Sequence, residues 1–291
     1  MSKKSERDIL ALISMADDPD QQVFEEISAK IVAYGPEALS YLEDAYDQAP
    51  GEMLRDRLAS LMTTIRFNSL SSKLHLWAKS NHDDLLEPWI EITRFFRPHL
   101  DESSIRSTLG KFTKDLWLEM NDNLTALEQI KVFNHIFYGI YKFRGDIEDY
   151  HNPDNSFIDR VMDERKGSPL SIGIIYMLLA RSVDLPVRGI NLPEHFVLTY
   201  LGERLDTESL QIHRDQPLFY INAFSGGSVF SSDEINEFLL KLDLEPLPSF
   251  FMPCTNREII IRMLNNLIFS YEQIGQGHKV KGFAELRDRL Q

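Results

Sequence analysis

The residues that could do chemistry lie at a predicted helix start and at a histidine on a later predicted strand. Ser168 is a favourable N-cap, and Pro169 suits the first position of a helix. His195 stands where a strand is predicted to begin. A helix N-terminus and an imidazole together stabilise a thiolate, which a cysteine hydrolase or transamidase needs. The pattern therefore has the frame of acyl-transfer chemistry, although no cysteine stands at the helix start.

The elements that must position these residues follow from hydrophobic periodicity. Ile172, Ile175 and Leu179 recur at helical spacing, and the helix should end at Asp184-Leu-Pro186. Residues 187–192, 196–201 and 218–222 are rich in β-branched and aromatic side chains, which predicts three strands. We expect the polar residues 201–217 to form an excursion between strands. The chain should thus bring a helix start and a strand-borne histidine to a common point.

Five motifs follow one another in a fixed order around this helix. They are Phe143-Arg-Gly-Asp146, Tyr150-His-Asn-Pro-Asp-Asn-Ser156, Lys166-Gly-Ser-Pro-Leu-Ser171, Leu192-Pro-Glu-His-Phe196 and Tyr220-Ile-Asn-Ala-Phe-Ser-Gly-Gly227. Over about residues 125–250 this run resembles the SirB1 family of the transglutaminase-like superfamily. The resemblance implies a papain-like α+β core in which a Cys at a helix N-terminus, a His on the next strand and an Asp or Asn on a third act together.

The resemblance carries over to individual residues of this sequence. Counted without gaps, the superfamily cysteine falls on Pro169, and a shift of two residues places it on Ser171. His195 matches the histidine, and Asn222 stands where the family usually has Asp. Glu194 replaces a Gly that is common in the family's L-P-G-H motif. We expect Ser168, Pro169 and Glu194 to line the pocket of this site.

Three functions are open at this point. We favour a non-catalytic protein that binds a peptide or protein partner in the former active-site groove, with the N-terminal helices as a second contact surface, because acyl transfer needs a nucleophile more than it needs the frame. The first alternative is a hydrolase or acyl transferase with Ser171 as nucleophile, His195 as base and Asn222 as orienting residue. The second alternative is a purely structural scaffold. Cys254 is the remaining nucleophile candidate, but it follows His195 and so reverses the superfamily order.

The chain divides into three predicted regions. Residues 1–122 form an all-helical domain, in which the helices around Gly35-Pro36 resemble a HEAT-like hairpin. Residues 123–250 form the transglutaminase-like core, which opens with the capping-box sequence Thr125-Ala-Leu-Glu128. Residues 251–291 form a C-terminal helical extension with room for one tetratricopeptide-like unit at most. The expected fold class is therefore α+β, with a small antiparallel sheet between helical ends.

An aromatic concentration in the first region has two interpretations. Trp77, Trp89, Phe95 and Phe96 could form a recognition surface, but large aromatic residues at helical spacing are more often core. We therefore predict that they are core residues.

Composition excludes several function classes. The 291 residues carry a net charge of −14, which disfavours binding to nucleic-acid phosphates. A single cysteine and eight scattered histidines offer no disulfide framework and no metal-ligand pair, so we expect neither a metal nor a cofactor. No apolar run reaches the roughly 18 residues of a membrane span, and no signal-peptide core follows the N-terminal lysines. We therefore expect a cytoplasmic protein without membrane contact.

Overall fold

The fold is described here from a computed structural model, which covers residues 3–80, 84–121, 123–205 and 212–290. Its helices and small antiparallel sheet confirm the predicted α+β class. By its internal contacts the chain forms two compact units, Met1–Ser80 and Asn81–Gln291. The predicted boundary at Asp122 lies at a residue outside the described part, and the three-region division stays a prediction.

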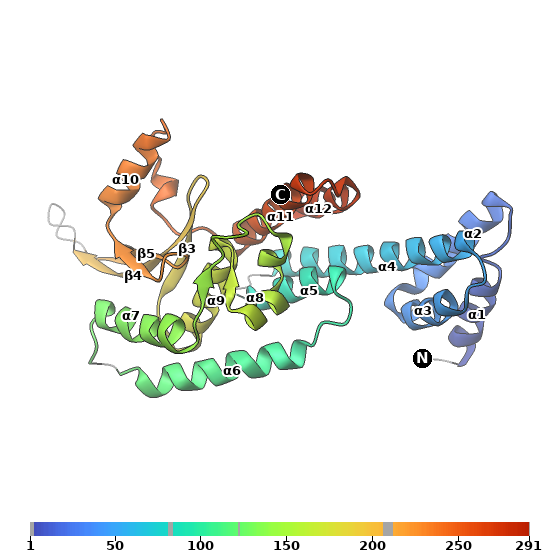
Figure 1. Cartoon of the computed structure of the whole chain (residues 1–291), viewed down its shortest axis with the longest axis horizontal. Coiled ribbons are helices and arrows are strands. Elements are labelled where there is room, and N and C mark those ends of the chain that lie inside the picture. Colours follow the sequence, from blue (N-terminus) through green and yellow to red (C-terminus); the bar gives the residue numbers. More distant parts are fainter. Residues whose placement is uncertain (1–2, 81–83, 122, 206–211, 291) are drawn as a thin grey trace. The chain divides into compact units, whose positions relative to one another are not determined.

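The described part of the first unit contains the α-helices α1 to α4 and a short 3-10 turn at Gly35–Ala38 (Figure 1). The helices are α1 (Lys3–Ser14), α2 (Gln21–Tyr34), α3 (Leu39–Gln48) and α4 (Glu52–Lys79). The side chain of Asp20 caps α2, and Gly35 ends it with a φ of 63° that favours glycine. Ile31, Leu42 and Leu58 are fully buried in one apolar cluster, so this unit has a core of its own.

The second unit holds the other helices (Figure 1). They are α5 (Leu86–Phe96), α6 (Glu102–Glu119), α7 (Ala126–Asn134), α8 (Ile158–Glu164), α9 (Pro169–Ser182), α10 (Ser232–Lys241), α11 (Asn256–Gln273) and α12 (Gly277–Leu290). The predicted capping box at Thr125 is present at the start of α7, which continues as a π-helical turn over His135–Ile140. Among the described residues of the chain, no helix combines the length and apolar character needed to cross a bilayer.

Two sheets belong to the second unit. The larger is antiparallel with the order β3-β4-β5-β6, formed by Val187–Asn191, Phe196–Leu205, Ile212–Asn222 and Ser228–Phe230. The smaller is a short parallel pair of β1 (Arg144–Gly145) and β2 (Lys166–Gly167). The prediction that residues 201–217 form an excursion between strands was wrong for the described part of that stretch. There β4 and β5 continue as paired strands, as far as the pair of Leu205 with Ile212. Residues 206–211 lie outside the described part.

Helices cover both faces of the four-stranded sheet. Strand side chains alternate between faces, so Ile190 and Val197 pack with Leu239 of α10 on one face. Phe196 and Leu198 reach α9 on the other face, where Gly173 lets the Phe196 ring approach the helix backbone. A Cβ at Gly173 would lie 2.8 Å from that ring. The start of α9 and the start of β4 are thereby held together.

The last two helices form a hairpin that packs on the core of the second unit. The ring of Phe283 on α12 stacks on Tyr271 of α11 and on Phe96 of α5. Trp89 and Trp77 are buried as predicted, whereas Phe95 and Phe96 are only half-buried. The helices α11 and α12 thus form one hairpin, and α11 faces the site described next.

Candidate functional site

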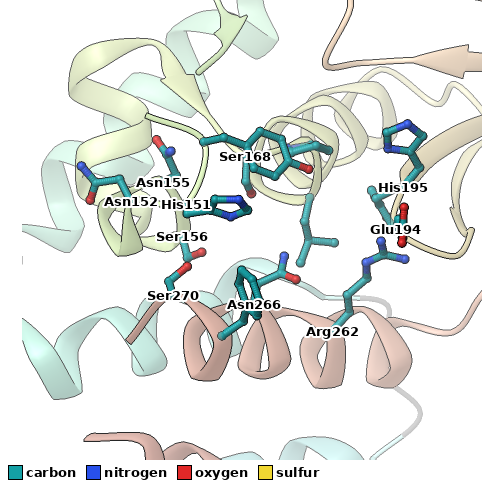
Figure 2. Close-up of a pocket in the computed structure, with 15 residues that line it drawn as sticks. His151, Asn152, Asn155, Ser156, Ser168, Glu194, His195, Arg262, Asn266 and Ser270 are labelled. Carbon is teal, nitrogen blue, oxygen red and sulfur yellow. The ribbon is translucent and has the colours of Figure 1, made fainter. Parts of the chain in front are cut away.

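A pocket of about 550 Å³ opens between four segments of the second unit (Figure 2). One wall is the loop of residues 150–156, and a second is the N-terminus of α9. The turn between β3 and β4 and the exposed side of α11 complete it. The size is typical of pockets that bind small molecules or short peptide segments.

The helix start at the back of the pocket is built by local hydrogen bonds. The β1–β2 pair leads into it, and Lys166 Nζ lies 3.2 Å from the buried Asp146 carboxylate, which ties the two strands together. The Ser168 hydroxyl accepts a hydrogen bond from the Ser171 amide at 3.2 Å, and Pro169 occupies the first helical position. The predicted start of α9 is therefore confirmed, and both Ser168 and Pro169 line the pocket.

Ser171 lies behind this pocket wall. Its side chain is 1% exposed, and its hydroxyl donates to the backbone carbonyl of Asn155 at 2.6 Å. The Ser168 hydroxyl lies 3.0 Å from the Ser171 Oγ and can donate to it. A serine hydroxyl has one proton to donate, and here the closest acceptor is a structural carbonyl. Ser171 therefore joins the 150–156 loop to α9 and is not among the residues that line the pocket.

Glu194 and His195 form the tight turn between β3 and β4. Glu194 has a φ of 58°, and the His195 amide donates to the Pro193 carbonyl at 2.6 Å. Both side chains are exposed and both line the pocket. The His195 ring stacks on Phe238 of α10 with centroids 4.9 Å apart. His195 therefore lies on the outer rim of the pocket, with its imidazole stacked on an aromatic ring. The sequence pattern had instead predicted that it forms a dyad beside a nucleophile.

Asn222 ends β5 away from the pocket lining. It pairs with Ser228 of β6, and its side-chain oxygen accepts a hydrogen bond from the Ser225 amide at 3.1 Å. No hydrogen bond joins Asn222 to His195 in the part of the chain that the structure describes. The structure brings Ser168, Pro169, Glu194 and His195 together, while Ser171 and Asn222 serve other contacts.

The wall formed by α11 was missed from the sequence. Arg262, Asn266, Phe269 and Ser270 line the pocket from this helix, and His151 faces them from the loop, where its ring packs edge-on against Phe269 (Figure 2). The sequence placed α11 in an extension beyond the core. The available signal was a single arginine in an otherwise apolar stretch of the helix, since a cation among apolar residues needs a partner or a function.

Arg262 is the dominant charge in the interior of the pocket. Its Nη1 donates to the Asn191 side-chain oxygen and to the Leu192 carbonyl, the latter at 2.6 Å. Burial lowers its pKa from the usual arginine range, but a guanidinium stays charged at neutral pH. The charge is therefore partly desolvated, and both of these hydrogen-bond partners are neutral.

Metal ligands are not grouped at this site. Within the described residues, no set of three or more His, Cys, Asp or Glu side chains is placed to hold a metal ion. His151 and His195 lie on different walls of the pocket (Figure 2). That the protein works without a metal or a cofactor stays a prediction.

Cys254 lies outside the pocket, at the edge strand β3. Its thiol donates to the Gly189 carbonyl at 3.2 Å, and its amide donates to the same oxygen at 2.9 Å. Burial raises the pKa of the thiol to about 12, and the nearby Glu258 adds to this effect. Because the thiolate is the nucleophile, Cys254 is poorly suited to catalysis.

Alkylation should therefore be slow in the native protein. We expect iodoacetamide at pH 8 to modify Cys254 at least about tenfold more slowly in the folded protein than after denaturation, because folding suppresses the thiolate. Mass spectrometry of timed samples measures both rates. Equal rates in the two states would show that the thiol is ionised or freely exposed.

More than half of the chain matches a known protein family. Residues 103–265 match the family described as "Transglutaminase-like superfamily". This range includes the start of α9, the β3–β4 turn and the Arg262 position of α11.

Curated relatives are bacterial and mammalian. The chain is 24% identical to a UPF0162 protein of Xylella fastidiosa (strain 9a5c) over 213 residues, which are 71% of this chain and 70% of that protein. It is 27% identical to a UPF0162 protein of Vibrio cholerae over 143 residues, 49% of each chain. It is also 27% identical to F-box only protein 21 of Mus musculus over 163 residues, 55% of this chain but 24% of the mouse protein. No solved structure matches this chain.

Proposed function

Because the chain belongs to the transglutaminase-like superfamily, we propose that it is a non-catalytic member that binds a peptide segment of a protein partner in the pocket of the former active site. Within the superfamily we assign it to the SirB1 group on the five ordered motifs around α9. In this protein the superfamily fold is kept, and its former active-site pocket serves for binding instead of catalysis.

The hydrogen bonding of Ser171 carries this proposal. A nucleophilic serine must present its hydroxyl to a base on one side and to the substrate on the other. The Ser171 hydroxyl is buried and donates to the Asn155 carbonyl, and His195 sits on the outer rim. Pro169, the gapless counterpart of the superfamily cysteine, has no reactive atom. The alternative of a hydrolase built on Ser171, His195 and Asn222 therefore lacks geometric support.

The character of the pocket supports a peptide as its occupant. Tyr150 and Phe269 offer aromatic surface, whereas Asn266 offers an amide group that can pair with a peptide backbone. A pocket of about 550 Å³ with this mixture exceeds what a purely structural scaffold requires.

The absence of serine chemistry is directly testable. A fluorophosphonate probe should leave Ser171 unmodified, because its hydroxyl is buried and donates to the Asn155 carbonyl instead of to a base. Peptide mapping by mass spectrometry after incubation with the probe measures this. Stoichiometric labelling of Ser171 that disappears in His195→Ala would replace our proposal with the hydrolase.

Binding is tested by filling the pocket. Asn266→Trp places a bulky ring inside the cavity, and we expect it to lower the signal on an array of randomised 12-residue peptides at least about tenfold. Gln273→Trp is the matched control, since residue 273 is exposed on the same helix and outside the pocket. Equal binding by both variants and the unmodified protein would place any peptide site elsewhere.

A further inference from the structure

The Arg262 guanidinium is a partly desolvated cation inside a pocket. It rises from α11 toward the β3–β4 turn (Figure 2), where Nη1 bonds to Asn191 and Leu192. These two oxygens fix its orientation but carry no charge. Across the described residues, no Asp or Glu forms an ion pair with Arg262. A partly desolvated charge that has only neutral partners is costly, and an anion beside it would offset this cost.

The surroundings of Arg262 favour an anion with hydrogen-bonding oxygens. Asn266 lies one helical turn further along α11, and its side chain points into the pocket (Figure 2). The N-terminus of α9 lies across the pocket from it, and the helix dipole adds partial positive charge there. The aromatic side of the cavity, formed by Tyr150 and Phe269, accommodates the carbon atoms that carry the anion.

Glu194 places a negative charge at the entrance of the pocket that holds Arg262. It is exposed on the rim and lines the same pocket, yet it is not paired with Arg262 in the part of the chain described. In exposed positions a charge is well screened by water, whereas Arg262 is half-buried and less screened. The positive charge of Arg262 therefore dominates the inner part of the pocket despite the net charge of −14 of the chain.

We propose that the pocket recognises its peptide through a carboxylate group, which pairs with the free side of the Arg262 guanidinium and is oriented by Asn266. The inference rests on the proposed function and names the chemistry that the peptide must carry. Arginine presents its donors in a planar fork that matches the two oxygens of a carboxylate. The carboxylate comes from an acidic side chain or from the C-terminus of the partner.

Three small probes separate these two sources. N-acetyl-glutamate N-methylamide carries only a side-chain carboxylate, and N-acetyl-glutamine carries only an α-carboxylate. N-acetyl-glutamine N-methylamide has nearly the same shape without a charge. Titration of the isotope-labelled 291-residue chain by NMR gives a dissociation constant for each probe. We expect at least one carboxylate probe to bind at least about tenfold more tightly than the neutral one.

The role of Arg262 is tested by charge removal. Arg262→Gln should abolish the preference for the carboxylate probe, while Arg188→Gln, which removes a cation from β3 outside this pocket, should keep it. If Arg262→Gln does not fold, the role of Arg262 can still be tested by NMR on the wild-type protein. The Arg262 Nε–H resonance should shift with the carboxylate probe and stay in place with the neutral one.

The outcomes distinguish this inference from the proposed function. The inference fails if the carboxylate probes bind no more tightly than the neutral probe, or if they leave the Arg262 resonance unmoved. The proposed function still stands in that case, provided that array peptides bind the wild-type protein and no longer bind Asn266→Trp. Absence of any peptide binding overturns both. A preference that survives in folded Arg262→Gln assigns the recognition to another residue and also overturns the inference.

Discussion

Replacing Trp89 with alanine should lower the free energy of unfolding by about 3–5 kcal/mol, because it removes a fully buried indole from the core of the second unit. The indole Nε1 also donates to the Ser156 carbonyl at 2.7 Å. Ser156 lines the pocket, so this contact joins α5 to the loop at the site. Urea unfolding followed by circular dichroism measures the loss.

Trp117→Ala is the matched control for this prediction. Trp117 lies on α6 of the same unit but is 68% exposed, so its removal should change stability by about 0.5 kcal/mol or less. Similar losses for the two variants would contradict the assignment of Trp89 to the core. Trp89→Phe separates packing from hydrogen bonding, since it keeps an aromatic ring but leaves the Ser156 carbonyl unpaired, at a cost of about 1–3 kcal/mol.

The first half of the site could be predicted because its signals are local. A serine followed by proline marks the start of α9 within two residues, and apolar spacing continues the helix. The strands β3 and β4 have β-branched composition and a turn that includes Pro193, so His195 was correctly placed at the start of β4. Each of these assignments depends on a few neighbouring residues.

The second half of the site depends on contacts between distant parts of the chain. Arg262 bonds to Leu192, 70 residues earlier, and no periodicity in α11 specifies that docking. The strands β4 and β5 were also predicted too short. Their outer residues are mostly polar, and a polar stretch is typical of a loop when its strand partner is unknown.

The direction of the Ser171 hydroxyl illustrates the same limit at atomic scale. At the third position of a helix, a serine can serve the backbone or face a substrate, and both interpretations fit the local sequence. What decides between them is the Asn155 carbonyl, 16 residues earlier, which the turn-rich loop brings to 2.6 Å. Sequence patterns predicted the frame of the site, while tertiary contacts determine which of its hydroxyls is available.

The packing around Ser171 leads to the second large effect, that of Gly167→Ala. A Cβ at Gly167 would lie 2.6 Å from the Ser171 Oγ and 3.1 Å from a methyl carbon of Val161. The Ser171 side chain or the backbone must shift to make room for the methyl group, and this shift would break or weaken the hydrogen bond from Ser171 to Asn155. Overpacking by one methyl group costs about 1–3 kcal/mol and a lost hydrogen bond about 1 kcal/mol more, so we expect a loss of about 2–4 kcal/mol.

A double-mutant cycle tests the cause of this loss. Ser171→Ala removes the oxygen that the new methyl group would meet, so Gly167→Ala should cost less in that background than in the wild type. Gly110→Ala is the control, because Gly110 is exposed within α6 and a Cβ added there would meet nothing within 4 Å, so alanine should stabilise the protein by about 0.5–1 kcal/mol. Additive losses at residues 167 and 171 would mean that Ser171 is free to turn away, as a nucleophile facing the pocket would be.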